Sequence, residues 1–123
     1  MEFDDIALGI DIEEISRFKG KTLENDKDFL TRIYTEKELD YSFKSSKPEG
    51  RLCARFCAKE AVVKALSNFN ISDVYYSDIE ILNKEDGSPI VRVEKHPYVS
   101  FKISLSHCKT YATASVIAYK QGK

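Results

Sequence analysis

A carboxylate and an amine stand one helical turn apart in the middle of this chain. Glu60 and Lys64 lie within residues 55–66, whose composition predicts an uninterrupted helix. At about 100° per residue, both side chains fall in a narrow seam between two packed faces of that helix. A buried charge is costly unless it is paired or bound to a ligand. The pattern therefore indicates either a helix salt bridge, which stabilises by about 0.2–0.5 kcal/mol, or a binding site.

A second carboxylate, Asp11, ends the first predicted strand, residues 6–12. It shares one strand face with Ala7 and Gly9, which leave room beside it for a bulky ligand. The alternative is that Asp11 caps the helix that follows, with Glu14 three residues later completing a capping box.

Asp11 and Glu60, if the fold brings them together, would offer two hard oxygen ligands. This set suits Mg²⁺, which takes one or two carboxylates and completes its coordination with water and substrate phosphates. Lys64 would then face the same phosphates as a point charge. Two carboxylates, a lysine and a magnesium ion are a recurring combination in phosphoryl transfer.

A third candidate site is Ser106-His107, at the end of a predicted strand. A serine hydrolase is not indicated, because adjacent residues of an extended chain point to opposite faces and no G-x-S-x-G motif is present. His107 is either a functional residue or a loop histidine that hydrogen-bonds its surroundings. With Cys53, Cys57 and Cys108 it could also surround a zinc ion, although the spacing is not that of a zinc finger.

The composition is that of one soluble globular domain, residues 1–123. The chain is 42% hydrophobic and 32% charged, and no apolar run approaches the roughly 20 residues that span a membrane. The acidic start lacks the basic region of a secretory signal, so we expect a cytoplasmic protein. A net charge of −1 argues against nonspecific binding of nucleic acid. Arg17, Lys19 and Lys21 nevertheless form a local basic cluster that could meet an acidic partner.

The hydrophobic patterns predict helices in the middle of the chain and antiparallel strands after residue 75, so the fold class is α+β. A capping box, Thr35-x-x-Glu38, opens a short helix through Phe43, and Pro48 lies in the first turn of the long helix. Asp86-Gly87 marks a hairpin between two of the strands. The predicted strands are residues 79–82, 90–93, 99–106 and 111–119.

Three blocks of residues together resemble the holo-acyl-carrier-protein synthase family, the small class of 4′-phosphopantetheinyl transferases. They occur in the family's order and span most of the chain. The blocks are Gly9-x-Asp11 followed by Arg17, then Arg55-Phe56-x-x-Lys59-Glu60-Ala61-x-x-Lys64-Ala65, and then Ser104-x-Ser106-His107 with Ala112-x-Ala114-x-Val116.

The resemblance implies a small mixed or antiparallel sheet packed on a long central helix, with short accessory helices. It implies an enzyme of fatty-acid biosynthesis that moves phosphopantetheine from coenzyme A to a serine of apo acyl carrier protein. The serine hydroxyl would attack the β-phosphoryl group and release adenosine 3′,5′-bisphosphate. Family members are typically trimers with active sites between subunits, which would cover the helix's alanine stripe or the sheet edges.

The resemblance also assigns roles to residues. Asp11 and Glu60 would hold Mg²⁺ against the pyrophosphate of coenzyme A, and Lys64 would stabilise charge on the phosphoryl group. Glu60, or a water near the metal, is the candidate general base. Arg55 and His107 would contact the nucleotide, and Arg17 would contact the acidic carrier protein. Lys19 and Lys21 join Arg17 on charge and proximity alone.

One segment departs from the family pattern. Residues 67–71 follow the central helix, where the family has a glycine-rich turn, and contain no glycine. Asparagine can adopt the left-handed conformation, so Asn68 or Asn70 could preserve the turn. If the turn is lost, the chain would be a non-catalytic binding module of the same fold. A small zinc-linked interaction domain is the other alternative.

Overall fold

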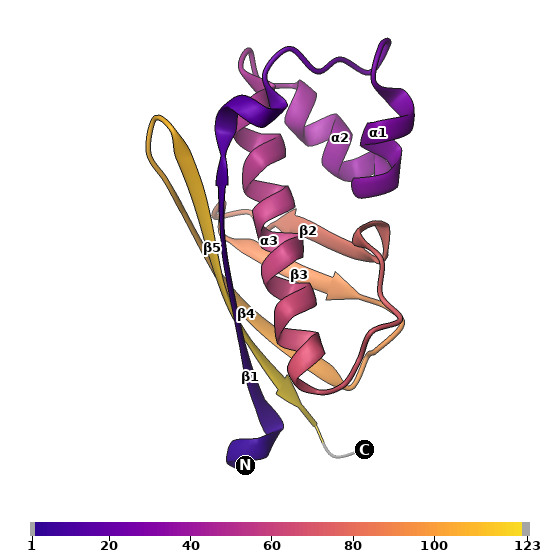
Figure 1. The fold of residues 1–123 in the computed structure, drawn as a ribbon, viewed down its shortest axis with the longest axis vertical. Helices are drawn as coiled ribbons and strands as arrows, with labels where there is room; N and C mark the ends of the chain where they lie inside the picture. Colours follow the sequence, from indigo (N-terminus) through magenta and orange to yellow (C-terminus); the bar gives the residue numbers. More distant parts are fainter. Residues whose placement is uncertain (1, 122–123) are drawn as a thin grey trace.

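Residues 2–121 are described by a computed structural model, in which they form three α-helices, five β-strands and three short 3₁₀ helices (Figure 1). The order of elements, helices before most of the strands, confirms the α+β class. The helices are α1 (Lys27–Ile33), α2 (Glu36–Phe43) and α3 (Pro48–Asn68); the strands are β1 (Ile6–Glu14), β2 (Ile79–Asn83), β3 (Pro89–Val93), β4 (Val99–His107) and β5 (Tyr111–Lys120); and the 3₁₀ helices are η1 (Phe3–Asp5), η2 (Ile15–Phe18) and η3 (Tyr76–Asp78).

The strands form two antiparallel sheets. One has the order β1–β5–β4, and the other is the β2–β3 hairpin. Helix α3 packs against both sheets, and α1 and α2 gather around one end of it (Figure 1). In the larger sheet Asp11 lies opposite Ala114, and His107 lies opposite Ala112. Strand β1 also lies against the middle of α3, where Asp11 pairs with Lys64.

Several local predictions are confirmed. Thr35 and Glu38 form the capping box of α2, and Pro48 is the first residue of α3. Gly87 has φ of 91° in the β2–β3 turn, a conformation that glycine adopts without strain. The prediction that Asp11 caps the following helix is wrong, because β1 continues through Glu14 and η2 begins at Ile15.

The small residues of β1 accommodate the central helix. A Cβ atom on Gly9 would lie 1.8 Å from the main-chain oxygen of Ala61 in α3. The prediction that Gly9 leaves room for a ligand is therefore wrong, since α3 occupies that space. Ala58, Ala61 and Ala65 of the alanine stripe are fully buried against this side of the sheet. Of the four stripe residues, Ala54, Ala58, Ala61 and Ala65, only Ala54 is partly exposed, so the other three do not need a partner subunit to cover them.

The opposite face of the sheet carries large apolar side chains at the surface. Leu8, Ile10 and Ile12 on β1 are 66%, 68% and 60% exposed, and Ile117 on β5 is 49% exposed. Leu8 pairs directly with Ile117, so these residues form one continuous outer face. Large contiguous apolar surfaces of this kind usually mark an interaction site.

A fully buried ion pair joins α2, α3 and the start of β2. Lys59 Nζ lies 2.8 Å from Glu38 Oε1, and both side chains are inaccessible to solvent. Lys59 also donates hydrogen bonds to the main-chain oxygens of Tyr76 and Ile79, while Glu38 accepts one from the Ile81 amide. Burial lowers the pKa of Lys59, and the neighbouring Glu38 carboxylate opposes that shift.

No helix among residues 2–121 has the length and apolar character required to span a bilayer.

Candidate active site

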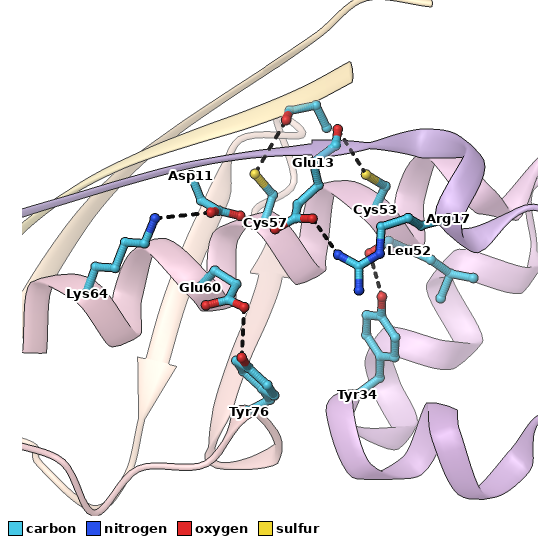
Figure 2. Close-up of polar contacts among 11 residues, drawn as sticks. Asp11, Glu13, Arg17, Tyr34, Leu52, Cys53, Cys57, Glu60, Lys64 and Tyr76 are labelled. Carbon is cyan, nitrogen blue, oxygen red and sulfur yellow. Dashed lines mark hydrogen bonds and ion pairs between the residues drawn. The ribbon is translucent and has the colours of Figure 1, made fainter. Parts of the chain in front are cut away.

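Strand β1 and helix α3 bring Asp11, Glu60 and Lys64 into one region (Figure 2). Lys64 Nζ lies 3.2 Å from Asp11 Oδ1 and donates a second hydrogen bond, of 3.0 Å, to the main-chain oxygen of Ile10. Among the residues that the structure describes, the ion pair of Lys64 is thus with Asp11. The prediction of a simple helix salt bridge between Glu60 and Lys64 is therefore wrong.

The Asp11 carboxylate has the features of a cation ligand. Its side chain is only 10% exposed. Its second oxygen, Oδ2, is buried and has no hydrogen-bond partner among residues 2–121. An ionised oxygen that is buried without a donor is unfavourable, and a divalent cation would satisfy it. The residues present therefore fit Mg²⁺, with Asp11 as one ligand.

Glu60 lies on α3 between Asp11 and the aromatic ring of Tyr76 in Figure 2. Its Oε2 accepts a hydrogen bond of 2.8 Å from the Tyr76 hydroxyl. Burial raises the pKa of Tyr76 to about 12, and the carboxylates of Glu60, Asp11 and Glu13 add to this increase. Of these three carboxylates, the Glu60 carboxylate is the one that contacts the Tyr76 hydroxyl directly.

Glu13 was not identified from the sequence, although it lies two residues after Asp11 on the same strand face. It accepts a hydrogen bond of 2.5 Å from Arg17 Nη1. Burial raises the pKa of Glu13, and the nearby Asp11 carboxylate raises it further. Strand periodicity could have placed Glu13 beside Asp11, but only the fold shows that both point toward α3.

The basic cluster is partly engaged within the chain. Arg17 pairs with Glu13, and its guanidinium lies 5.2 Å from the ring centroid of Phe56. Lys21 Nζ is 4.0 Å from Asp26, and Lys19 is exposed. Half of the Arg17 side chain remains accessible, at 51%. Arg17 thus lies at the surface beside Glu13, and Lys19 and Lys21 follow it on the chain.

The cysteines do not assemble a zinc site. Cys53 Sγ donates to the main-chain oxygen of Glu13, and Cys57 Sγ donates to that of Ala112. Burial raises the pKa of both thiols, that of Cys53 to about 11. Across residues 2–121, no three His, Cys, Asp or Glu side chains converge as metal ligands. The described residues therefore do not form the zinc site that the alternative of a zinc-linked domain requires.

Arg55 and His107 line a separate pocket of about 660 Å³, between α2, α3, the β2–β3 turn and β4. The Arg51 and Arg55 guanidinium carbons each lie 4.1 Å from the ring centroid of Tyr41. Arg55 Nη2 donates to Asn83, while its buried Nε has no partner within the described residues. Two arginines, a histidine and an aromatic ring suit an anionic ligand with a planar group.

The glycine-free turn after α3 is well formed. Asn70 has φ of 61°, the left-handed conformation that ends many helices. The Ile71 amide donates to the Leu66 oxygen at 3.1 Å, and the Phe69 amide donates to the same oxygen at 2.9 Å. The prediction that an asparagine preserves this turn is confirmed, with Asn70 in the role.

Comparisons with known proteins agree with this arrangement. The family model of the 4′-phosphopantetheinyl transferase superfamily matches residues 7–116. A holo-[acyl-carrier-protein] synthase of Dehalococcoides mccartyi is 42% identical over 121 residues, covering 92% of this chain and 98% of the relative. One of Chlamydia pneumoniae is 40% identical over 118 residues, covering 92% and 96%.

Solved structures resemble the fold closely. A Bacillus anthracis holo-(acyl-carrier-protein) synthase in complex with CoA (3′,5′-ADP) has a TM-score of 0.78 and 30% identity, covering 94% of this chain and 96% of that one. A Helicobacter pylori holo-[acyl-carrier-protein] synthase in complex with coenzyme A has a TM-score of 0.75 and 27% identity, covering 90% and 98%. The chain therefore belongs to the 4′-phosphopantetheinyl transferase superfamily, and within it to the holo-[acyl-carrier-protein] synthase family.

Proposed function

We propose that residues 1–123 act as a single phosphopantetheinyl transferase domain that modifies apo acyl carrier protein. The observation that carries the proposal is the juxtaposition of Asp11, Glu60 and Lys64, in a chain that also has a separate cationic pocket. The substrate in this proposal is coenzyme A, whose nucleotide half is anionic and whose pyrophosphate needs charge neutralisation. The reaction joins the carrier serine oxygen to the β-phosphorus, breaks the pyrophosphate bond and releases adenosine 3′,5′-bisphosphate.

Asp11 and Glu60 are the proposed ligands of Mg²⁺. The unpartnered Oδ2 of Asp11, which has no hydrogen-bond partner among residues 2–121, supports this assignment. Bound Mg²⁺ would supply charge stabilisation at the pyrophosphate oxygens.

Lys64 is the proposed cationic group for the transferring phosphoryl group. Its side chain is 55% exposed, and its Nζ forms an ion pair with Asp11 Oδ1 at the edge of the site. A cation bound to Asp11 competes with Lys64 for that carboxylate, because like charges repel at short range. The ammonium group is then available to the phosphoryl oxygens, where a lysine acts as a point charge.

The pocket lined by Arg55 and His107 is the proposed nucleotide site. Its volume of about 660 Å³ is within the usual range for ligand pockets. The buried Nε of Arg55 has no hydrogen-bond partner among the described residues, and this free donor supports an anionic ligand in the pocket. The Arg51 and Arg55 guanidinium groups, each 4.1 Å from the Tyr41 ring centroid, offer donors for a phosphate.

Arg17, Lys19 and Lys21 are the proposed contacts for the acidic carrier protein. They are accessible or partly accessible and lie on the chain just after β1, and Arg17 pairs with Glu13, two residues after Asp11. Charges at the rim of an interface mainly raise the association rate. Within this proposal the protein is cytoplasmic and serves fatty-acid biosynthesis.

The outer face of the β1–β5–β4 sheet is the proposed subunit interface of a trimer. Leu8, Ile10, Ile12 and Ile117 are exposed there. A groove of about 590 Å³ extends along this sheet and includes Lys64 in its lining. The interface and the catalytic region are thus contiguous, which fits active sites shared between subunits.

The proposal is tested by measuring release of adenosine 3′,5′-bisphosphate. The purified chain is mixed with coenzyme A, Mg²⁺ and an apo acyl carrier protein, and the nucleotide products are separated by chromatography. We expect one nucleotide per carrier, and none with a carrier whose acceptor serine is replaced by alanine. No nucleotide release with several carriers, from a folded protein, would contradict the transferase and favour the binding module.

A further inference from the structure

Tyr76 contacts the candidate metal site from a part of the chain that none of the sequence motifs includes. It is the first residue of η3, immediately before β2. Its hydroxyl donates a hydrogen bond of 2.8 Å to Glu60 Oε2 (Figure 2). The acceptor is thus the carboxylate that we assign to the cation, and the donor comes from a different element.

Tyr76 is held both through its main chain and through its ring. Its main-chain oxygen accepts a hydrogen bond of 2.8 Å from Lys59 Nζ, the buried lysine that pairs with Glu38. Its ring packs 5.4 Å, centroid to centroid, from the ring of Phe56. Lys59 directly precedes Glu60 in α3, so one helix turn positions both the tyrosine and the carboxylate that it contacts.

Among the described residues, no cation fixes the Glu60 carboxylate, so its orientation depends on the Tyr76 hydroxyl. Its carboxylate lies on the same side of α3 as Asp11, a like charge, and Lys64 directs its ammonium group to Asp11. A glutamate has three side-chain torsions, and leaving them free costs affinity when a ligand must be bound in one geometry. A fixed hydroxyl removes that freedom.

We propose that Tyr76 is a positioning residue, whose hydroxyl holds Glu60 Oε2 and thereby presents Oε1 to the divalent cation shared with Asp11. This inference rests on the metal assignment of the proposed function. Hydrogen-bonding partners of metal ligands typically contribute about 10- to 100-fold to metal affinity. Tyr76 therefore acts on metal binding, through Glu60, and takes no part in the bond-making step.

The test is calorimetric titration of the full chain with Mg²⁺ in the presence of coenzyme A and without carrier, so that no turnover occurs. Tyr76→Phe keeps the ring that packs on Phe56 and removes only the hydroxyl. The matched control is Tyr75→Phe, which removes a hydroxyl from the neighbouring, exposed tyrosine. Thermal unfolding of each variant is measured alongside.

We expect Tyr76→Phe to weaken Mg²⁺ binding about tenfold, with an unchanged melting temperature, and Tyr75→Phe to match the wild type. In a Glu60→Gln background, Tyr76→Phe should have no further effect. An unchanged Mg²⁺ affinity for Tyr76→Phe would overturn the inference. So would an equal loss in the Glu60→Gln background, or a variant that no longer folds, which would make the hydroxyl structural.

The two proposals fail in different ways. A wild-type chain that transfers phosphopantetheine while Tyr76→Phe binds Mg²⁺ normally would overturn the positioning role alone. A chain that shows the expected Mg²⁺ affinities but transfers nothing would overturn the proposed function alone. A wild-type chain that binds no Mg²⁺ with coenzyme A would overturn the positioning role together with the metal assignment.

Discussion

The two oxygens of the Asp11 carboxylate have different surroundings in the candidate site. Lys64 lies on Asp11 Oδ1, while Oδ2 is buried with no partner in the described residues. The Asp11 side chain thus pairs with the Lys64 ammonium group through one oxygen and retains the other oxygen for the proposed metal ion. We therefore expect substitutions of Lys64 and Asp11 to have different kinetic signatures.

Replacing Lys64 by alanine should reduce kcat about 100-fold, the usual cost of removing one charge-stabilising group from a transition state. Mg²⁺ affinity should be retained, because the variant leaves both carboxylates and removes a competing cation. Steady-state kinetics and Mg²⁺ titration measure the two effects. Lys109→Ala, in the exposed β4–β5 turn, is the control and should match the wild type. A lost Mg²⁺ affinity with normal kcat would contradict the role.

The sequence predicted which motif residues meet, but not how each is engaged. Spacing along α3 placed Glu60 and Lys64 on one seam, and strand alternation placed Asp11 on the face that meets it. Helix geometry could not show that Lys64 would choose Asp11, because that ion pair spans 53 positions. Tyr76 was not predicted, since it reaches Glu60 from the far end of a loop.

At the scale of elements, the close approach of β1 and α3 sets the geometry of the site. Gly9 lies against the main chain of Ala61. Gly9 is two positions before Asp11 on the strand, and Ala61 directly follows Glu60 on the helix. The distance between the two carboxylates therefore depends on a contact that only glycine permits. The periodicity of the sequence predicted both elements. The small residues Ala7 and Gly9, however, were expected to leave space for a ligand and not for the helix.

Gly9→Ala should reduce the free energy of unfolding by about 3 kcal/mol or more, because the new methyl group would overlap main-chain atoms that cannot rotate away. Urea unfolding followed by circular dichroism measures the change. Gly50→Ala is a matched control: a Cβ there meets no atom within 4 Å, so its stability should be equal or higher by up to about 1 kcal/mol. A Gly9→Ala protein as stable as wild type would contradict the close packing.

The sequence predicted the helices and strands better than the way in which they pack. Capping residues and alternation predicted α2, α3 and the five strands, because these signals are local, but they did not predict α1. The separation of β2–β3 from the larger sheet and the Lys59–Glu38 pair depend on tertiary contacts. The apolar alternation of Leu8, Ile10 and Ile12 predicted a strand, but did not reveal that this side faces outward.

At the scale of the whole molecule, one sheet has two different apolar faces. The inner face, of small residues, is buried by α3, and the outer face, of large residues, is exposed. A chain that leaves its larger aliphatic side chains in contact with water requires a partner to gain their burial energy, about 25 cal/mol per Å². The trimer proposed above provides that burial.

Ile10→Glu should convert the trimer to monomers, because a carboxylate in the middle of an apolar interface loses its hydration without a partner. Size-exclusion chromatography with light scattering measures the mass, and transfer per chain should fall with it. Ile90→Glu, on the exposed side of β3, is the control and should leave the mass unchanged. A monomeric wild type, or an Ile10→Glu variant of unaltered mass, would refute the interface.

The central claim is that Asp11 and Glu60 support transfer of phosphopantetheine to a carrier serine, and intact-mass spectrometry of the carrier tests it most directly. Wild-type chain with coenzyme A and Mg²⁺ should add one phosphopantetheine to each carrier, and a chelator should stop the addition. Asp11→Asn should slow the reaction by at least about 100-fold, while Glu14→Gln, at the exposed end of β1, should not. No mass gain with the wild type, or an Asp11→Asn variant as fast as Glu14→Gln, would contradict the account.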